Sequence, residues 1–230
     1  AIDAGKADID LQPGVYQEAI NRKSTVTIEG LDGAVAHCFN LNGANNVTLK
    51  NIEFDAAKAE MAYDGKGNQR PYASIMSGGA NKNGKGTNGL VIDGCTFTGH
   101  FDNGGTTIAF NDQGRGTGQS GNITIKNCTF ETTGTLAHIY TYYSGKDAFN
   151  IENNIFKTTA VWYSIYLGRY QSSTPVVVKG NTFEKYADFA SAAIIQPHSS
   201  AYSPSFDESD KPFELGVGES QTINWTMSDG

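Results

Sequence analysis

One eight-residue pattern recurs along this chain and constrains its fold more than any other feature. Each copy carries apolar residues at positions one and three, Asn or Gly at position five and Phe at position eight. Alternating apolar and polar residues are typical of a half-buried strand, and Asn and Gly tolerate the left-handed backbone of a sharp bend. Each copy therefore predicts a strand, a one-residue corner and a second strand. The five copies are Val47–Phe54, Leu90–Phe97, Ile123–Phe130, Phe149–Phe156 and Val176–Phe183.

The spacing of these copies predicts a solenoid. Their Phe residues are 43, 33, 26 and 27 positions apart, and a repeat of about 20–50 residues with a strand in each unit is typical of coils that bury their apolar faces by stacking. We therefore predict an all-β parallel solenoid with three short strands per coil and roughly six to eight coils. The third strand is expected at Thr107–Phe110, Ile139–Tyr142, Ser164–Leu167 and Ala192–Ile195.

The opening segment Ile9–Tyr16, followed by Ser24–Gly30, is similar to the entry coil of a known class, the right-handed parallel β-helix of the pectate-lyase-like superfamily. The resemblance covers roughly residues 7–200 and concerns architecture. It implies one β-helix domain over 1–230, with an N-terminal cap or entry coil over 1–20, coils over 21–197, and a loop and C-terminal cap strand over 198–230. The terminal strand is expected at Gln221–Met227. The class includes lyases, hydrolases, adhesins and phage tailspikes, so the fold does not select a reaction.

Composition narrows the class of protein. A chain of 230 residues, 38% of them hydrophobic, is large enough for one domain with a continuous core. The net charge of −7 argues against nucleic acid as a partner, because phosphate backbones attract basic surfaces. No apolar run reaches membrane-spanning length, so we expect no membrane insertion.

Two cysteines occupy the same position of consecutive copies. Cys95 and Cys128 are therefore expected about 4.8 Å apart inside the core. A disulfide between them is geometrically feasible, but we favour two reduced thiols that pack as small apolar groups. Together with Cys38 the count is odd, which argues against a disulfide framework.

The third strands carry the candidate site residues. Because Ile108, Ile139 and Ile165 take the inward positions, their neighbours are expected to face outward and form a lateral aromatic stripe. Polysaccharides bind such stripes through ring stacking and polar side chains, and an interface between subunits would use the same kind of face. The stripe comprises Tyr140, Tyr142, Tyr166 and Tyr170, and it is edged by Asp112, Arg115, His138 and Arg169.

The candidate catalytic residues are those at the edge of the stripe. A polysaccharide lyase needs a base and either Ca²⁺ or an arginine to neutralise the uronate carboxylate. Arg115 or Arg169 would be the base, His138 is a further candidate, and Asp112 would belong to a Ca²⁺ site. A glycoside hydrolase needs two carboxylates, for which the stripe offers only Asp112 and Asp102. For His138 a second interpretation is a packed side chain beneath a loop.

These observations favour a non-catalytic β-helix protein of a cell surface or a virion, with a structural, decorating, adhesive or glycan-binding role. Its partners would be a polysaccharide or other subunits of an assembly, a homotrimer among them, and we expect no cofactor and no resident metal. The alternative is a polysaccharide-active enzyme, either a uronate lyase with Ca²⁺ as its metal or a glycoside hydrolase. A carbohydrate-binding module would keep the groove but lack the acid–base pair.

Overall fold

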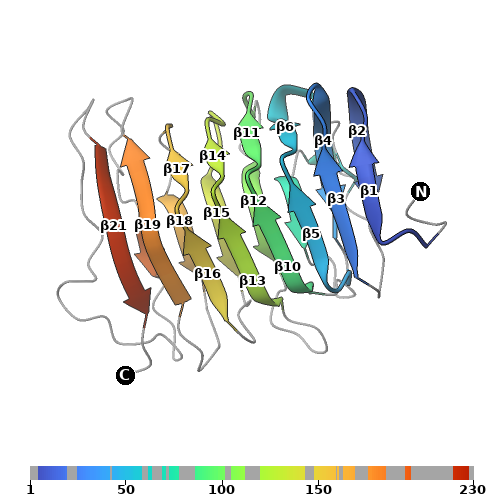
Figure 1. Ribbon diagram of the computed structural model, residues 1–230. Helices are drawn as coiled ribbons and strands as arrows, with labels where there is room; N and C mark the ends of the chain where they lie inside the picture. The colour runs from blue at the N-terminus through green and yellow to red at the C-terminus, as the bar shows by residue number, and fades with distance from the viewer. Residues whose placement is uncertain are drawn as a thin grey trace.

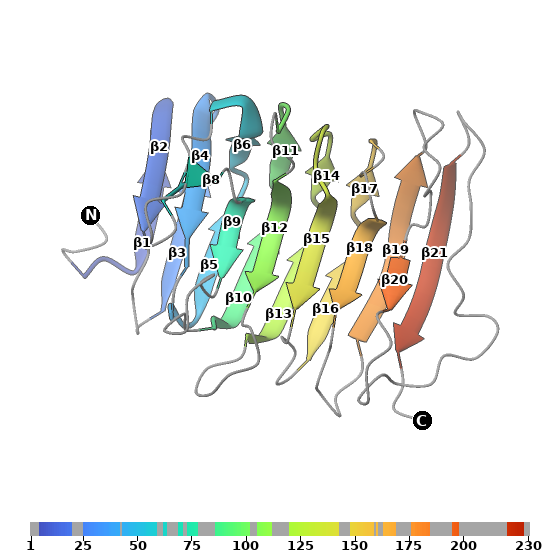
Figure 2. The same ribbon diagram turned by 180° about the vertical axis from the view of Figure 1, so that it is seen from behind.

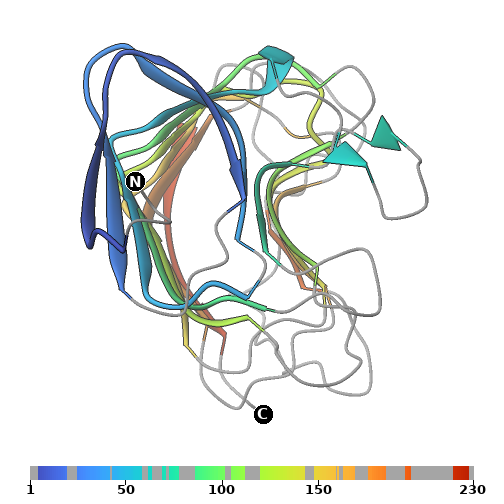
Figure 3. The ribbon, with the colours of Figure 1, turned by 90° about the vertical axis from the view of Figure 1, so that its right-hand side faces the viewer.

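The computed structural model is a parallel β-helix in which 19 strands form one continuous hydrogen-bonded sheet (Figures 1 and 2). The structure describes residues 5–19, 25–41, 43–58, 62–63, 69–70, 73–77, 86–101, 105–111, 120–142, 148–158, 160, 163–168, 176–184, 195–197 and 220–227. Viewed along the stack, the coils have three faces (Figure 3). The predicted fold class, an all-β parallel solenoid with three strands per coil, is confirmed.

Each face is a ladder of strands from successive coils. Face 1 consists of β1 (Asp8–Leu11), β3 (Val26–Gly30), β5 (Val47–Lys50), β10 (Asn88–Asp93), β13 (Gly121–Lys126), β16 (Phe149–Glu152) and the first half of β19 (Val176–Glu184). Face 2 consists of β2 (Gly14–Ala19), β4 (Ala34–Asn40), β6 (Glu53–Asp55), β11 (Thr96–Thr98), β14 (Thr129–Phe130), β17 (Ile155–Phe156) and the second half of β19. Face 3 consists of β9 (Ala73–Ser77), β12 (Thr106–Asn111), β15 (Ala137–Tyr142), β18 (Tyr163–Gly168) and β20 (Ile195–Pro197).

Four elements depart from this plan. The strand expected at Gln221–Met227 is present as β21 (Ser220–Met227), and it pairs with β19 in the antiparallel sense. A short 3₁₀ helix, η1 (Ala56–Lys58), follows β6, and β7 (Ala62–Tyr63) pairs with β8 (Gln69–Arg70) apart from the main sheet. The strand expected at Ala192–Ile195 is observed only from Ile195, since residues 191–194 and the loop over 198–219 lie outside the described residues.

The core is built from side chains that stack in register. The five Phe residues at position eight are fully buried, with ring centroids 4.6–5.1 Å apart and interplanar angles of 5–13°. A second column on face 3 contains the buried Ile75, Ile108, Ile139 and Ile165. Such columns follow from the parallel register, which places equivalent side chains one strand spacing apart.

The predicted corner at position five is confirmed by the backbone. Asn51, Asn127 and Asn153 have φ values of 52°, 56° and 54°, and Gly94 and Gly180 both have a φ of 67°. These are left-handed values that Asn and Gly adopt at the least cost. The second half of each copy therefore leaves the plane of face 1 and begins face 2.

Beyond this corner, the side chain at position six replaces a missing backbone partner. The Asn154 Nδ2 atom donates to the carbonyl oxygen of Ile125 in the preceding coil, at 3.0 Å, and its Oδ1 atom accepts from the backbone nitrogen of Cys128, at 2.9 Å. Asn181 repeats this pattern one coil later, with 2.7 Å to the Ile151 carbonyl and 3.0 Å to the Asn154 nitrogen. Position six therefore suits a small side chain that both donates and accepts.

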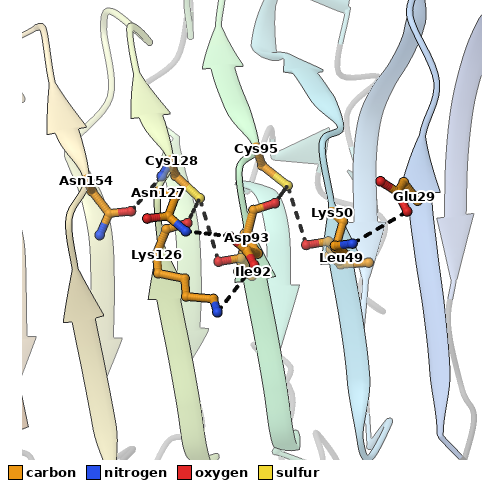
Figure 4. Close-up of polar contacts among 10 residues, drawn as sticks. All are labelled: Glu29, Leu49, Lys50, Ile92, Asp93, Cys95, Lys126, Asn127, Cys128 and Asn154. Carbon is orange, nitrogen blue, oxygen red and sulfur yellow. Dashed lines mark hydrogen bonds and ion pairs between the residues drawn. The ribbon is translucent and has the colours of Figure 1, made fainter.

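Cysteine meets the same requirement more weakly in the earlier coils. The Cys95 Sγ atom lies 3.7 Å from the Leu49 carbonyl oxygen, and the Cys128 Sγ atom lies 3.7 Å from the Ile92 carbonyl oxygen (Figure 4). Both thiols therefore point toward the position-three carbonyl of the preceding copy, as the asparagine side chains do. Both are buried and free, which confirms the predicted reduced thiols. Burial, and then the neighbouring Cys95 thiol, raise the pKa of Cys128 well above its usual value. Both thiols are structural hydrogen-bond donors, and the raised pKa of Cys128 keeps that thiol from the thiolate form of a reactive cysteine.

Replacing Asn154 with alanine tests this role of position six. The N154A variant leaves the buried Cys128 nitrogen and Ile125 carbonyl without these partners, so we expect its free energy of unfolding to fall by about 2–4 kcal/mol. Urea denaturation measures the change. The matched control is N150A in β16, the strand that precedes this corner; its side chain lies on the outer side of face 1, and the change should cost about 0.5 kcal/mol or less. Equal midpoints for the two variants would contradict this role.

Candidate functional site

His138, expected at the open edge of the aromatic stripe, is fully buried instead. Its ring lies between those of Phe130 and Phe156, with centroid distances of 5.6 and 5.7 Å. Its Nε2 atom is 2.9 Å from the carbonyl oxygen of Thr158. The prediction of an exposed His138 was therefore wrong, and the interpretation of a packed side chain is the one that the structure supports.

The environment of His138 keeps its ring neutral. Because a carbonyl oxygen can only accept, the Nε2 atom carries the proton that it shares with Thr158. The Nδ1 atom is buried and has no hydrogen-bond partner in the part of the chain that the structure describes. Burial lowers the pKa of His138 from 6.5 to about 4, against a smaller opposite effect of the hydrogen bond to Thr158. A ring enclosed in this way lacks the access to substrate that a general base needs.

Face 3 does bring two of the predicted tyrosines together. Tyr140 of β15 and Tyr166 of β18 are partners in the strand register, and their rings stack with centroids 5.1 Å apart and planes at 6°. Both side chains are half-buried. Each ring therefore turns one of its faces to the other along the axis of the stack.

The row that contains these tyrosines is uncharged. Met76, Ala109, Tyr140 and Tyr166 follow one another in register on the outer side of face 3, and Gln196 continues the row at β20. The residues one row earlier, Thr107 and Ser164, were expected to face outward beside His138 but are buried with it. The observed surface is thus narrower than the predicted stripe: within this row Ala109 is buried, at 2% exposed, and Met76, Tyr140 and Tyr166 are half-buried.

The other candidate side chains lie outside the part of the chain that the structure describes. Asp112, Arg115, Arg169 and Tyr170 lie outside the described residues, as does Asp102. Tyr142 is paired with Gly168 at the end of β15, and its side chain is not described. Among the described residues, no three His, Cys, Asp or Glu side chains are placed to hold a metal ion.

Face 1 carries a ladder of alternating charges that the sequence interpretation missed. Successive coils place oppositely charged side chains at position four, with Lys50 Nζ 3.6 Å from Glu29 and Lys126 Nζ 3.3 Å from Asp93 (Figure 4). The alternation of charge could have been found in the sequence by comparing the fourth residue of successive copies of the repeat. We call this series the charge ladder, and its members in register are Glu29, Lys50, Asp93, Lys126, Glu152 and Lys179.

The corner asparagines reinforce the acidic members of the charge ladder. Asn51 Nδ2 donates to a carboxylate oxygen of Glu29 at 2.8 Å, and Asn127 Nδ2 donates to one of Asp93 at 2.8 Å. Each of these acids therefore has a lysine and an amide from the following coil. On the outer side of face 1 these charged side chains are paired with other side chains of the same chain. This arrangement favours a face that is exposed to solvent.

Comparison with known proteins gives no relative: no family model, no curated protein and no solved structure matches this chain. Within the residues described, the structure contains no helix long and apolar enough to span a membrane.

The buried His138 predicts a specific dependence of stability on pH. Its pKa is about 4 in the folded state and 6.5 in the unfolded state, so between these values the unfolded chain binds a proton that the folded chain does not. Lowering the pH from 6.5 to 4 should therefore remove about 3 kcal/mol of stability through this residue. The H138F variant lacks this titrating ring. Its free energy of unfolding should therefore fall by about 3 kcal/mol less than that of the unmodified protein between pH 6.5 and 4, as measured by urea denaturation at each pH.

The control for this experiment is H100Q, because His100 is exposed. Comparison of H138F with H100Q separates the effect of removing a buried ring from the effect of removing a histidine as such. Parallel curves for H138F and the unmodified protein would show that the folded state accommodates a charged His138.

Proposed function

We propose that this chain is a non-catalytic β-helix protein of a cell surface or virion, with a structural or adhesive role, and that it belongs to the pectate-lyase-like architectural class. In this proposal the outer side of face 3 is the surface that contacts other subunits of the assembly. The observation that carries it is the uncharged outer row of face 3, in which Met76, Tyr140 and Tyr166 are half-buried and Ala109 between them is buried.

The contrast between the three faces supports this choice. Face 1 bears the charge ladder along its outer side, and face 2 bears charged residues such as Asp55, Glu131 and Lys157, the last two paired within the chain. The centres of protein interfaces are poor in charged residues and rich in tyrosine and methionine. Face 3 is the face whose described outer row meets this description.

The geometry of the tyrosine pair favours a protein partner over a sugar ring. Stacking of a sugar requires an accessible ring face. In this structure one face of Tyr140 and one face of Tyr166 are turned toward each other, so neither of these two faces is open to a sugar ring. Edges and hydroxyl groups suit a contact with protein side chains and backbone, where tyrosine is abundant.

A lysine placed in the middle of this row tests the proposal. We expect the unmodified protein to form an oligomer, a homotrimer being the simplest side-by-side assembly, when it is measured by light scattering behind a sizing column. The Y166K variant should raise the dissociation constant at least about 30-fold, because a central interface residue contributes about 2 kcal/mol or more.

The matched control is T124K, which adds the same charge on the outer side of face 1 and should leave the oligomer intact. Circular dichroism of both variants verifies that the fold is retained. A protein that is monomeric at every concentration would contradict the proposal, and cleavage of a uronate polysaccharide by that monomer would replace it with the enzyme alternative.

A further inference from the structure

Two buried thiols lie opposite each other in the stack of corners. Cys95 and Cys128 both occupy position six of the repeat, and the residues that follow them, Thr96 and Thr129, are partners in the strand register. The Thr129 nitrogen donates to the Cys95 carbonyl oxygen at 3.0 Å, which fixes the two coils at this point (Figure 4). The two cysteines therefore belong to adjacent strands, and equivalent atoms of adjacent strands are about 4.8 Å apart.

Both side chains point the same way. The Cys95 Sγ atom is 3.7 Å from the Leu49 carbonyl oxygen, and the Cys128 Sγ atom is 3.7 Å from the Ile92 carbonyl oxygen, the equivalent group one coil later. Burial raises the pKa of the Cys128 thiol, the Cys95 thiol adds to this increase, and the Cys95 backbone N–H opposes it as a donor to the Cys128 sulfur. These effects of Cys95 require close contact. We therefore expect the two sulfur atoms to keep the strand spacing of about 4.8 Å.

This separation decides which bridge the two sulfur atoms can form. A disulfide needs Cβ atoms about 3.5–4.5 Å apart, whereas the Cβ atoms of residues in register on parallel strands keep the spacing of about 4.8 Å. A zinc–thiolate bond is about 2.3 Å long, and two bonds of similar length in line span about 4.6 Å. A metal ion between the sulfur atoms therefore fits the stack as it stands, while a disulfide would pull the two coils together.

The surroundings of the two thiols favour a metal ion with few ligands. Their neighbours in the stack are Ile52 on one side and Asn154 on the other, and the Asn154 side chain bonds to backbone groups of the preceding coil. Within the described part of the chain, no group of three His, Cys, Asp or Glu side chains is placed around a metal ion. A structural Zn²⁺ takes four ligands, so this pair of thiols suits instead a soft cation that binds two sulfur ligands in line.

The charge of the bound state selects among such cations. Each metal–sulfur bond replaces a sulfur–hydrogen bond, so the two thiols release two protons and no group changes its oxidation state. Two thiolates neutralise a divalent cation, whereas a monovalent cation would leave one net negative charge in the core. An uncompensated buried charge is costly. A soft divalent cation that accepts two thiolates in line, as Hg²⁺ does, therefore fits these thiols best.

We propose that Cys95 and Cys128 form a binding site for a soft divalent metal cation such as Hg²⁺, held in line between their two sulfur atoms. The bridge joins the coil of β10 to the coil of β13 immediately after the corner. The position-five neighbours are the half-buried Gly94 and the exposed Asn127, so the site lies one residue beneath the surface of the corner. The proposal departs from the sequence-based expectation of no resident metal, and it does not depend on the contact through face 3.

The C38S variant is the protein for the decisive measurement, because Cys95 and Cys128 are then the only cysteines of the chain. Its thiols are reduced, the reductant is removed, and one equivalent of HgCl₂ is added. We expect native mass spectrometry to show one Hg²⁺ per chain with the loss of two protons. X-ray absorption at the mercury edge should show two sulfur ligands at about 2.3 Å and no others.

The C95S and C128S variants test each thiol separately. Their matched control is C38S, because Cys38 is likewise a buried, free thiol. With β-mercaptoethanol as the competitor for Hg²⁺, we expect the affinity of C95S and of C128S to lie at least about 100-fold below that of C38S, since one of the two linked bonds is lost. Circular dichroism verifies that each variant keeps the fold.

Three results would overturn the proposal: equal retention of Hg²⁺ by C95S and C38S, a single sulfur ligand in C38S, or binding without the release of protons. Tight binding of Zn²⁺ by C38S would also overturn it, because that ion requires further ligands. Should a serine at position six prevent folding, the stoichiometry and the ligand count of C38S still decide the question.

Discussion

The whole structure depends on the in-register stacking of corners. A left-handed residue at position five turns the chain, and this turn leaves the position-six nitrogen of one coil without a regular backbone partner. The side chain of Asn154 or Asn181 in the following coil supplies the missing acceptor and donates to the position-three carbonyl as well. Because a buried unpaired backbone group is costly, this arrangement ties the coils that contain β13, β16 and β19 to one register. The Phe and Ile columns of the core follow from that register.

Much of this fold is readable from the sequence because its determinants are local. The strand alternation, the Asn or Gly corner and the position-eight Phe each lie within eight residues, so each copy predicts its own conformation. The alternating charges at position four were equally readable, but only through a comparison between copies. A second series of left-handed residues, Asn46, Gly89 and Asn122, stands at the start of the face 1 strand in three coils and was not predicted. Its spacing from the corner at position five is constant, so a comparison between copies would also have found it.

The candidate site was less predictable, and His138 shows the physical reason. Alternation along β15 tells which side of the strand a residue occupies, but it says nothing about what covers that side. Here the rings of Phe130 and Phe156, together with Thr158, enclose the imidazole. Those groups come from the preceding strand and from the next coil. The Tyr140–Tyr166 pair was predictable because it follows directly from the Ile139–Ile165 register, which the repeat already implied. Asp112, Arg115 and Arg169 fall in long connections to which the repeat does not extend.

The same repetition that stabilises the stack limits where it can recognise partners. Along face 1, each charge is neutralised by its neighbour in the next coil, so this face has little preference for either sign of charge. Recognition is then left to places where the repeat changes. One such place is the outer row of face 3, where the side chains become aromatic at Tyr140 and Tyr166. The proposed contact through face 3 rests on this change, because the tyrosine pair is where the outer surface departs from the paired charges that face 1 repeats from coil to coil.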